Sequence, residues 1–264
     1  MCRHLAYVGP PVTLQELLLE PPYGLLHQSW APRRQRYGTV NADGFGAGWY
    51  AESRPEPARY RRAQPMWTDA SFTSLAGVVR SRCVLAAVRS ATAPSPAEES
   101  ATAPFLHGRW LFSHNGAVEG FAGAGGTALL DRRARVEGTA VRAESGADAA
   151  LLAALVFAEL ERGAALGPAL EAVVAEVTSV AAGRLNLLLT DGTEVAATTW
   201  GDTLSVLAGR GLAGSGVLVA SEPLDDDPGW ADVPDCSLVV ARPGDVAVRP
   251  LPAPNQTSGV RRPA

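Results

Sequence analysis

Short runs of apolar residues, each bounded by residues that favour turns, recur along the chain. Such runs predict buried β-strands, and the clearest are residues 84–88, 184–189, 194–199, 217–220 and 238–241. Asp191-Gly192 lies between two of these runs, and Pro243-Gly244-Asp245 precedes a further apolar run at 246–248. Both are turn sequences of the kind that join neighbouring strands in hairpins. The pattern therefore predicts antiparallel sheet.

Helical periodicity of apolar positions appears in four segments, which are residues 14–19, 72–79, 148–160 and 166–177. Segment 148–160 is apolar nearly all round, which predicts a buried helix. The predicted strands are bunched in hairpins and the predicted helices are grouped apart from them. This grouping favours an α+β layered fold over a doubly wound parallel sheet.

Polar stretches separate these elements and are predicted to be loops. They are residues 52–64, rich in Pro and Arg, residues 93–104, rich in Pro, Ser and Glu, and residues 120–146, rich in Gly, Ala and Arg. A chain of 264 residues can fold around one large core. We therefore expect a single domain over residues 2–251 and a disordered tail over residues 252–264.

The composition argues against nucleic acid and membranes as partners. A net charge of −4 gives no general electrostatic attraction to nucleic acid, and no apolar run is long enough to span a membrane. The chain has three cysteines and begins Met-Cys-Arg-His, without the apolar stretch of a secretion signal. These features predict a cytoplasmic protein with free thiols. They leave the oligomeric state open.

Cys2 follows the initiator Met1. Its side chain is small enough for an aminopeptidase to remove Met1, which would leave a free α-amine on a cysteine. An α-amine with a pKa of about 8 can accept the thiol proton and later pass it to a leaving amine. One residue would then supply both the nucleophile and the base, although a chain can also begin Met-Cys by chance.

The tetrapeptide Ser113-His114-Asn115-Gly116 follows an apolar run, residues 110–112, that predicts a strand ending at this motif. Acyl transfer needs preorganised N–H donors where negative charge develops on the carbonyl oxygen. Asn115 can offer its side-chain amide, and Gly116 can offer a backbone N–H without a Cβ in the way. The alternative is a plain Asn-Gly turn.

Arg89 and Asp148 are candidates for binding an amino-acid head group. Arg89 follows the predicted strand 84–88, where a guanidinium suits a carboxylate. Asp148 opens the apolar helix and could hold an α-ammonium group. The alternatives are a structural ion pair for Arg89 and a residue favoured by the helix dipole for Asp148.

The segment Asn41-Ala-Asp43-Gly44-Phe-Gly46 is a polar, glycine-rich turn. It could cradle substrate close to the backbone, or it could be a hairpin turn and nothing more. Its glycine spacing does not match a dinucleotide-binding fingerprint, and no long helix is predicted after it. We therefore expect no cofactor.

The ordered set of Cys2, Asn41-x-Asp43-Gly44, Arg89-Ser-Ala-Thr92, His114-Asn115-Gly116 and Asp148 resembles the class II glutamine amidotransferase family. The resemblance implies an N-terminal-nucleophile hydrolase fold, a four-layer αββα sandwich of two antiparallel sheets. It implies Cys2 as nucleophile, Asn115 and Gly116 as the oxyanion hole, Arg89 for a glutamyl carboxylate and Asp148 for the glutamyl amine. Thr92 and His114 would support the pocket.

A narrower resemblance covers most of the chain and is to the γ-glutamyl amidohydrolases of ergothioneine biosynthesis. It is carried by residues 31–35, 41–44, 87–92, 184–186, 199–204 and 220–227. Enzymes of that group remove glutamate from γ-glutamyl-hercynylcysteine sulfoxide and leave hercynylcysteine sulfoxide. No second domain is predicted after the glutaminase-like region, which favours water as the acceptor of the acyl group.

The side of the pocket that would bind the rest of this substrate has no motif. Trp30, Tyr37 and Trp200 are aromatic residues that could face a trimethylammonium group through cation–π contacts, or pack in the core. Ala149 and Ala150 follow Asp148, where amidotransferases commonly carry acidic and hydroxyl residues.

Three other interpretations remain open. The first is a glutaminase subunit that passes ammonia to a separate synthase, and the second is a catalytically silent protein that binds a γ-glutamyl metabolite. The third is a metal site, for which the candidate ligands are Cys2, His4, Cys83 and Cys236. Their spacing matches no common zinc pattern, so we expect no metal.

Overall fold

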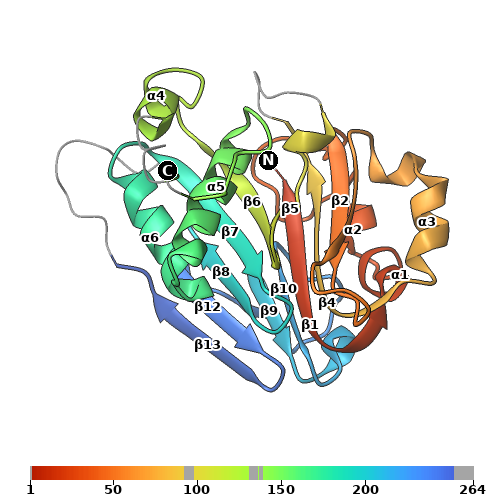
Figure 1. The fold of residues 1–264 in the computed structure, drawn as a ribbon. Helices are drawn as coiled ribbons and strands as arrows, with labels where there is room; N and C mark the ends of the chain where they lie inside the picture. Colours follow the sequence, from red (N-terminus) through yellow and green to blue (C-terminus); the bar gives the residue numbers. More distant parts are fainter. Residues whose placement is uncertain (1, 92–97, 131–135, 137–138, 253–264) are drawn as a thin grey trace.

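The computed structural model describes residues 2–91, 98–130, 136 and 139–252. Two antiparallel sheets pack face to face, and helices cover the outer face of each sheet (Figure 1). This arrangement confirms the predicted four layers. Of the predicted tail, residues 253–264 lie outside the described part of the chain. None of the described helices is long and apolar enough to cross a membrane.

The first sheet has seven strands, in the order β11 (Ala231–Asp232), β9 (Ser205–Ala208), β10 (Val217–Ala220), β1 (Arg3–Thr13), β4 (Arg80–Arg89), β2 (Gly44–Trp49) and β3 (Ala58–Arg62). The second has six, in the order β13 (Asp245–Pro250), β12 (Ser237–Arg242), β8 (Val195–Thr199), β7 (Gly183–Thr190), β6 (Trp110–Val118) and β5 (Phe105–His107). Both predicted hairpins are present, as β7–β8 and β12–β13.

The helices lie in two outer layers. Those that cover the first sheet are α1 (Leu14–Leu18), α2 (Leu25–Gln28) and α3 (Ala70–Ala76). Those that cover the second sheet are α5 (Asp148–Glu161) and α6 (Leu166–Thr178), which lie side by side in Figure 1. A further helix, α4 (Ala124–Leu130), precedes α5 in the chain. Helix α5 is buried along nearly its whole length, as its apolar sequence predicts.

Side chains alternate between two cores along the central strands. Ala6, Leu85 and Leu188 belong to the core between the sheets. Leu5 and Leu187, one residue away, face the two helical layers instead. Because successive strand residues point to opposite faces, this alternation decides which residues near the strand ends face the space between the sheets.

The prediction of a loop over residues 52–64 is wrong, because this segment contains β3. Strand β3 pairs with β2 at the edge of the first sheet. Its arginines have acidic partners: Arg59 and Arg61 both donate to the Glu144 carboxylate, at 2.7 and 2.8 Å, and Arg62 donates to Glu99 at 3.2 Å. An arginine-rich sequence can form an edge strand here because its charged side chains meet acidic partners, and charged side chains are common on edge strands.

Two other predictions need correction. The predicted strand 110–112 does not end at the Ser-His-Asn-Gly motif but continues through it, because Asn115 and Gly116 stay in register with Asn186 and Leu185 of β7. The predicted loop 120–146 contains α4, since an apolar side of this segment packs in the core of the second sheet.

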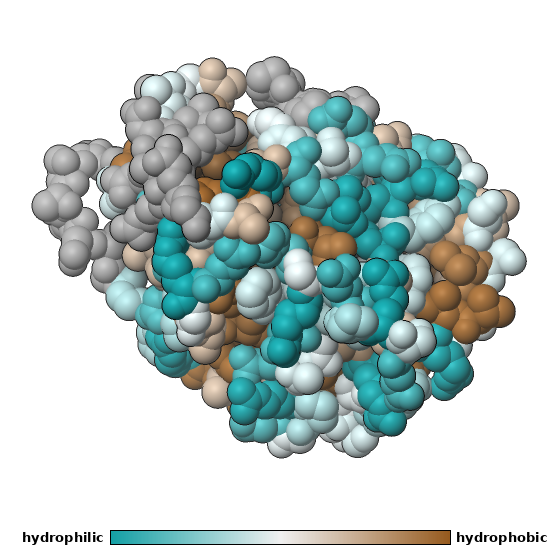
Figure 2. Space-filling model, in the orientation of Figure 1, coloured by the Kyte–Doolittle hydropathy of each residue, from teal (hydrophilic) through white to brown (hydrophobic). Residues whose placement is uncertain are grey.

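The face of the molecule seen in Figure 2 is mostly hydrophilic. A hydrophobic patch lies at its right, beside α1 and α3. Val78, which follows α3, is 76% exposed. This patch lies on the outer helical layer of the first sheet.

Candidate active site

A cavity of about 750 Å³ lies where the N-terminal end of β1 meets β4, β6, β7 and the start of α5. Its lining includes five of the predicted site residues, which are Cys2, Arg89, His114, Gly116 and Asp148. Segments that are far apart in the sequence are therefore brought to one place.

Cys2 reaches this cavity because it precedes β1 directly. Ala6 of β1 lies in the core between the sheets. His4, two residues earlier, faces the same way, and its Nδ1 lies 3.1 Å from the Ser113 Oγ of the opposite sheet. The same alternation directs Cys2 into the space between the sheets, at its end.

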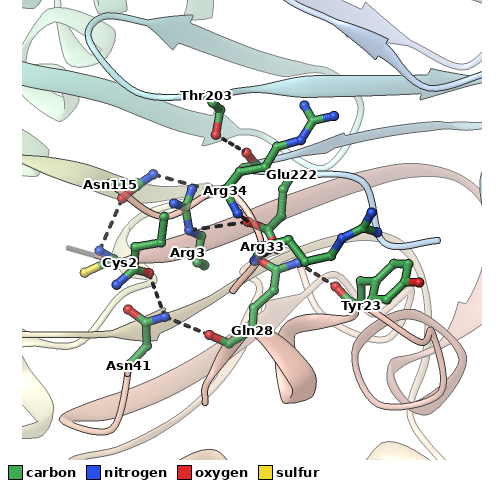
Figure 3. Close-up of polar contacts among 12 residues, drawn as sticks. Cys2, Arg3, Tyr23, Gln28, Arg33, Arg34, Asn41, Asn115, Thr203 and Glu222 are labelled. Atoms are coloured by element: carbon green, nitrogen blue, oxygen red, sulfur yellow. Dashed lines mark hydrogen bonds and ion pairs between the residues drawn. The ribbon is translucent and has the colours of Figure 1, made fainter. Parts of the chain in front are cut away.

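Asn115 is fully buried and contacts Cys2 directly. The Cys2 backbone nitrogen donates to the Asn115 Oδ1 at 3.2 Å (Figure 3). The Asn115 Nδ2 donates to the Ser221 Oγ at 3.5 Å, the long limit of a hydrogen bond. The Asn115 side-chain oxygen thus accepts from the Cys2 nitrogen, whereas the Asn115 Nδ2 makes only a weak hydrogen bond.

Ser221 is a site residue that the motifs did not identify as such. It follows β10, the neighbour of β1. Its Oγ accepts from the His4 backbone nitrogen at 3.0 Å, in addition to Asn115. This hydroxyl therefore joins β1 to the amide beside Cys2. Residues 220–227 carried the narrower resemblance, but only the register of the sheet shows what Ser221 contacts.

Gly116 occupies a position that only glycine can fill. A Cβ built there would collide with the Arg184 backbone carbonyl of β7. The close approach of β6 and β7 at this point explains why the residue after Asn115 has no side chain. It also leaves the Gly116 backbone open to the cavity.

Arg89 is the last residue of β4 and is nearly buried. The chain after it is held by Asp43, whose backbone nitrogen donates to the Arg89 carbonyl at 2.9 Å and whose Oδ2 accepts from the Ala91 nitrogen at 2.7 Å. Gly44 pairs with Arg89 in the β2–β4 register. Thr92, the predicted supporting residue, lies outside the described residues.

Asn41 is buried behind this region. Its Nδ2 donates to the Gln28 carbonyl at 2.7 Å and to the Gln35 Oε1 at 2.9 Å (Figure 3). Neither Asn41 nor its neighbours Asp43 and Gly44 are among the described residues that line the large cavity. Asp43 and Gly44 hold the backbone at Arg89, and direct contact of any of the three residues with substrate stays a prediction.

Asp148 begins α5, at the positive end of the helix dipole. Its Oδ2 accepts from the Val118 nitrogen of β6 at 3.1 Å, and its Oδ1 accepts from the Ala149 nitrogen at 2.7 Å. These backbone contacts fix the carboxylate at the cavity wall. Each carboxylate oxygen can accept a further hydrogen bond.

His114 and Arg184 form the neighbouring part of the wall. The His114 Nε2 lies 2.9 Å from the Arg184 backbone carbonyl. The Arg184 Nε donates to the Asp202 Oδ2 at 3.2 Å, and its guanidinium lies 4.3 Å from the centre of the Tyr37 ring. Burial raises the pKa of Asp202 above its ordinary value. Sequence reasoning assigned no role to Arg184.

The three aromatic candidates have different surroundings. Trp200 is buried in the core against the helices. Trp30 is 44% exposed, and its ring centre lies 5.9 Å from that of Trp67. Tyr37 is the one whose ring face meets a cavity residue, and that residue is Arg184.

Arg3 and Glu222 form a buried ion pair on the opposite face of β1 from Cys2. The Glu222 carboxylate also accepts from the Arg33 and Arg34 backbone nitrogens, both at 2.8 Å (Figure 3). Burial lowers the pKa of Arg3. The pair ties the segment around Arg33 to the start of β1.

The His4 imidazole is fully buried. Burial, with smaller contributions from His114 and Arg3, lowers its pKa to about 3. His4 is therefore neutral at physiological pH, which suits a residue that positions Ser113 between the sheets.

The cavity thus combines a thiol, a backbone N–H, a cation and a carboxylate. A thiol beside N–H donors can form and resolve an acyl intermediate, and a fixed cation and anion can hold an amino-acid head group. Cys83, one of the candidate metal ligands, contacts the Thr190 Oγ1 at 3.2 Å. Among the described residues, no three His, Cys, Asp or Glu side chains are grouped to hold a metal ion.

Comparisons with known proteins agree with this chemistry. The family model for class II glutamine amidotransferases matches residues 23–211. A γ-glutamyl-hercynylcysteine sulfoxide hydrolase from Mycolicibacterium smegmatis is 50% identical over 252 residues, which are 95% of this chain and 100% of that protein. A protein of the same name from Mycobacterium tuberculosis is 48% identical over 240 residues, which are 90% of this chain and 92% of that protein.

A solved structure supports the fold. It is the glutamine phosphoribosylpyrophosphate amidotransferase from B. subtilis, with a TM-score of 0.65 at 16% identity. The match covers 95% of this chain and 49% of that one. The likeness confirms the predicted sandwich of two antiparallel sheets between helical layers.

Proposed function

Because the chain belongs to the class II glutamine amidotransferases, we propose that it is an amidohydrolase whose nucleophile is Cys2, exposed by removal of Met1. It hydrolyses the γ-glutamyl amide bond of γ-glutamyl-hercynylcysteine sulfoxide and releases glutamate and hercynylcysteine sulfoxide. The substrate is the one in the names of the relatives that cover nearly the whole chain.

The contact between the Cys2 nitrogen and the Asn115 Oδ1 carries this proposal. It holds the amine in place beside the thiol. The amine takes the thiol proton as the sulfur attacks the γ-carbonyl carbon, and the oxygen becomes an oxyanion. The Asn115 Nδ2 and the Gly116 N–H donate to that oxygen. The Nδ2 is available because its contact with Ser221 is long.

The tetrahedral intermediate then collapses. The carbon–nitrogen bond breaks, the leaving nitrogen takes the proton from the Cys2 amine, and a thioester with glutamate remains. Water attacks the thioester carbon with its proton passing to the amine, the carbon–sulfur bond breaks, and glutamate leaves with the thiol restored. Atoms and charges balance without a cofactor.

The glutamyl head group lies between Arg89 and Asp148. Arg89 binds its α-carboxylate and Asp148 accepts from its α-ammonium group. Both line the cavity with Cys2, and both are held by backbone contacts on either side of it. His114 and the segment from Asn41 to Gly44 support this end of the pocket.

The cysteines also bear on location. Cys2 and Cys83 carry free thiols, and free thiols are typical of a reducing compartment. We place the enzyme in the cytoplasm on this basis.

To test this proposal, the purified protein is given γ-glutamyl-hercynylcysteine sulfoxide or glutamine in parallel assays, and the release of glutamate is measured. The proposal expects faster release from the sulfoxide, no turnover by Cys2→Ala, and normal turnover by Cys236→Ala, which alters a thiol outside the cavity. Intact mass shows whether Met1 has been removed. Preference for glutamine would favour a glutaminase subunit, and binding without product would favour a silent binding protein. Full activity with Met1 retained would contradict the mechanism.

A further inference from the structure

Arg184 lies at the junction of two cavities. It lines the 750 Å³ cavity that contains Cys2, and it also lines a second, more polar cavity of about 330 Å³. The second cavity is formed in part by Tyr37, Asp202 and Asp232. Among the described residues that line the two cavities, Arg184 is common to both.

Two contacts hold the Arg184 guanidinium in place without involving its two terminal nitrogens. Its Nε is bonded to Asp202 at 3.2 Å, and one face lies over the Tyr37 ring. The side chain is only 15% exposed. Within the described part of the chain, its Nη1 and Nη2 atoms form no hydrogen bond. A rigid guanidinium with free terminal nitrogens is a ready donor pair for a carboxylate.

Arg184 and Arg89 come from different sheets. Arg89 ends β4 of the first sheet, and Arg184 lies in β7 of the second, opposite Ala117 and one residue from the partner of Gly116. The register places the Arg184 side chain next to the proposed oxyanion donors. Two cations on two sheets suit a substrate that carries a carboxylate on each side of the scissile amide.

The leaving amine of the proposed substrate carries such a group. Its nitrogen belongs to a cysteine, whose carboxylate is attached to the carbon next to that nitrogen. Glutamine, by contrast, releases ammonia and has no carboxylate on this side. A cation here therefore distinguishes γ-glutamyl amino acids from simple γ-glutamyl amides.

We propose that Arg184 binds the carboxylate of the leaving amine and thereby selects γ-glutamyl amino acids, with Tyr37 and Asp202 holding its guanidinium in place. The proposal rests on the proposed γ-glutamyl hydrolysis. The second cavity then gives room for the remainder of the leaving group beyond the carboxylate. Arg184 acts as a specificity-determining residue, while Arg89 serves the glutamyl group that all substrates share.

Two small probes isolate this carboxylate. γ-Glutamylalanine and γ-glutamylethylamine differ only by a carboxylate on the carbon next to the scissile nitrogen. The wild type should prefer γ-glutamylalanine in kcat/KM. Arg184→Met should lower kcat/KM for γ-glutamylalanine by about ten- to hundredfold, the range for a lost hydrogen bond to a charged group. The loss for γ-glutamylethylamine should be far smaller.

Arg89→Met is the matched control, because it should lower kcat/KM for both probes by a similar factor. Arg184→Lys keeps the charge without the paired N–H geometry and should retain part of the preference. The double variant Arg184→Met/Asp202→Asn avoids an unpaired buried carboxylate and should match Arg184→Met. Cleavage of γ-glutamylethylamine reports that each variant is folded.

The outcomes separate the two proposals. If the wild type cleaves neither probe nor γ-glutamyl-hercynylcysteine sulfoxide, the proposed function fails. If it cleaves both probes equally well, or if the Arg184 variants keep the wild-type preference, the function stands and the role of Arg184 is overturned.

Discussion

The Arg3 guanidinium lies 3.9 Å from the Glu222 carboxylate, and both side chains are buried. The carboxylate accepts two backbone N–H groups as well, from Arg33 and Arg34. Because Arg3 follows Cys2 directly, this pair anchors the start of β1 from the face opposite the cavity. The position of the nucleophile therefore depends on a buried charge pair in the outer part of the fold.

Glu222→Ala should destabilise the protein strongly. It leaves the Arg3 charge buried without a partner and removes the acceptor of two backbone N–H groups, and breaking a buried pair typically costs about 3–5 kcal/mol. Urea denaturation measures the change in unfolding free energy. Glu171→Ala, which removes an ion pair with the half-exposed Arg249, should cost about 1 kcal/mol or less. Equal effects of the two variants would show that the buried pair has no special role.

Asn115→Ala should lower kcat by roughly 10²- to 10³-fold, the scale for one lost oxyanion donor. Asn115→Asp separates the two functions of the amide. It keeps an acceptor for the Cys2 nitrogen but has no N–H to donate, so we expect a similar fall. Steady-state kinetics measures both variants. A loss below about threefold for Asn115→Ala would place the oxyanion hole elsewhere, and recovery by Asn115→Asp would assign the residue to the amine alone.

The pattern of apolar runs predicted β4, β7, β8, β10 and β12 and the buried helix α5, because these segments are apolar on the faces that pack. It did not predict β1, whose first residues are polar. Arg3 and His4 are buried only because Glu222 and Ser113 meet them from distant parts of the chain. Such burial depends on partners that a local pattern does not contain.

The same limit applies to the site. Motifs identified the residues around Cys2. Ser221 and Arg184 lie in segments that carried the narrower resemblance, but their roles follow only from the register of the sheets. Arg184 lies beside the cavity because it pairs with Ala117 of β6, and Ser221 because β10 neighbours β1. The resemblance marked these segments without giving a role to either residue, and the fold shows where each side chain lies.

The buried His4 should make stability depend on pH. Its folded pKa of about 3 lies below the ordinary value of 6.5, so the unfolded chain binds a proton that the folded chain does not. The contribution is fully present above pH 6.5 and is lost as pH falls from about 6.5 towards 3, by at most about 1.4 kcal/mol per pH unit. Unfolding free energies measured between pH 7 and pH 5 should show this slope.

His4→Gln is the comparison for that slope, because it removes the titrating group and keeps a side chain that can hydrogen-bond to Ser113. Between pH 7 and pH 5, where few carboxylates titrate, the unfolding free energy of the variant should fall less steeply than that of the wild type. An unchanged slope in His4→Gln would assign the pH dependence to other groups.

Gly116→Ala should disrupt the site through the backbone. The added Cβ would collide with the Arg184 carbonyl and approach the His114 Nε2 within 2.7 Å, and a carbonyl in a sheet ladder cannot move aside as a flexible side chain can. We expect a loss of about 1–3 kcal/mol in unfolding free energy from overpacking, together with a fall in kcat. Gly123→Ala is the control, because the nearest atom to its Cβ would be 3.7 Å away. Denaturation and steady-state kinetics of both variants test this expectation. If Gly116→Ala has no more effect on stability and kcat than Gly123→Ala, the close approach of β6 and β7 does not shape the oxyanion site.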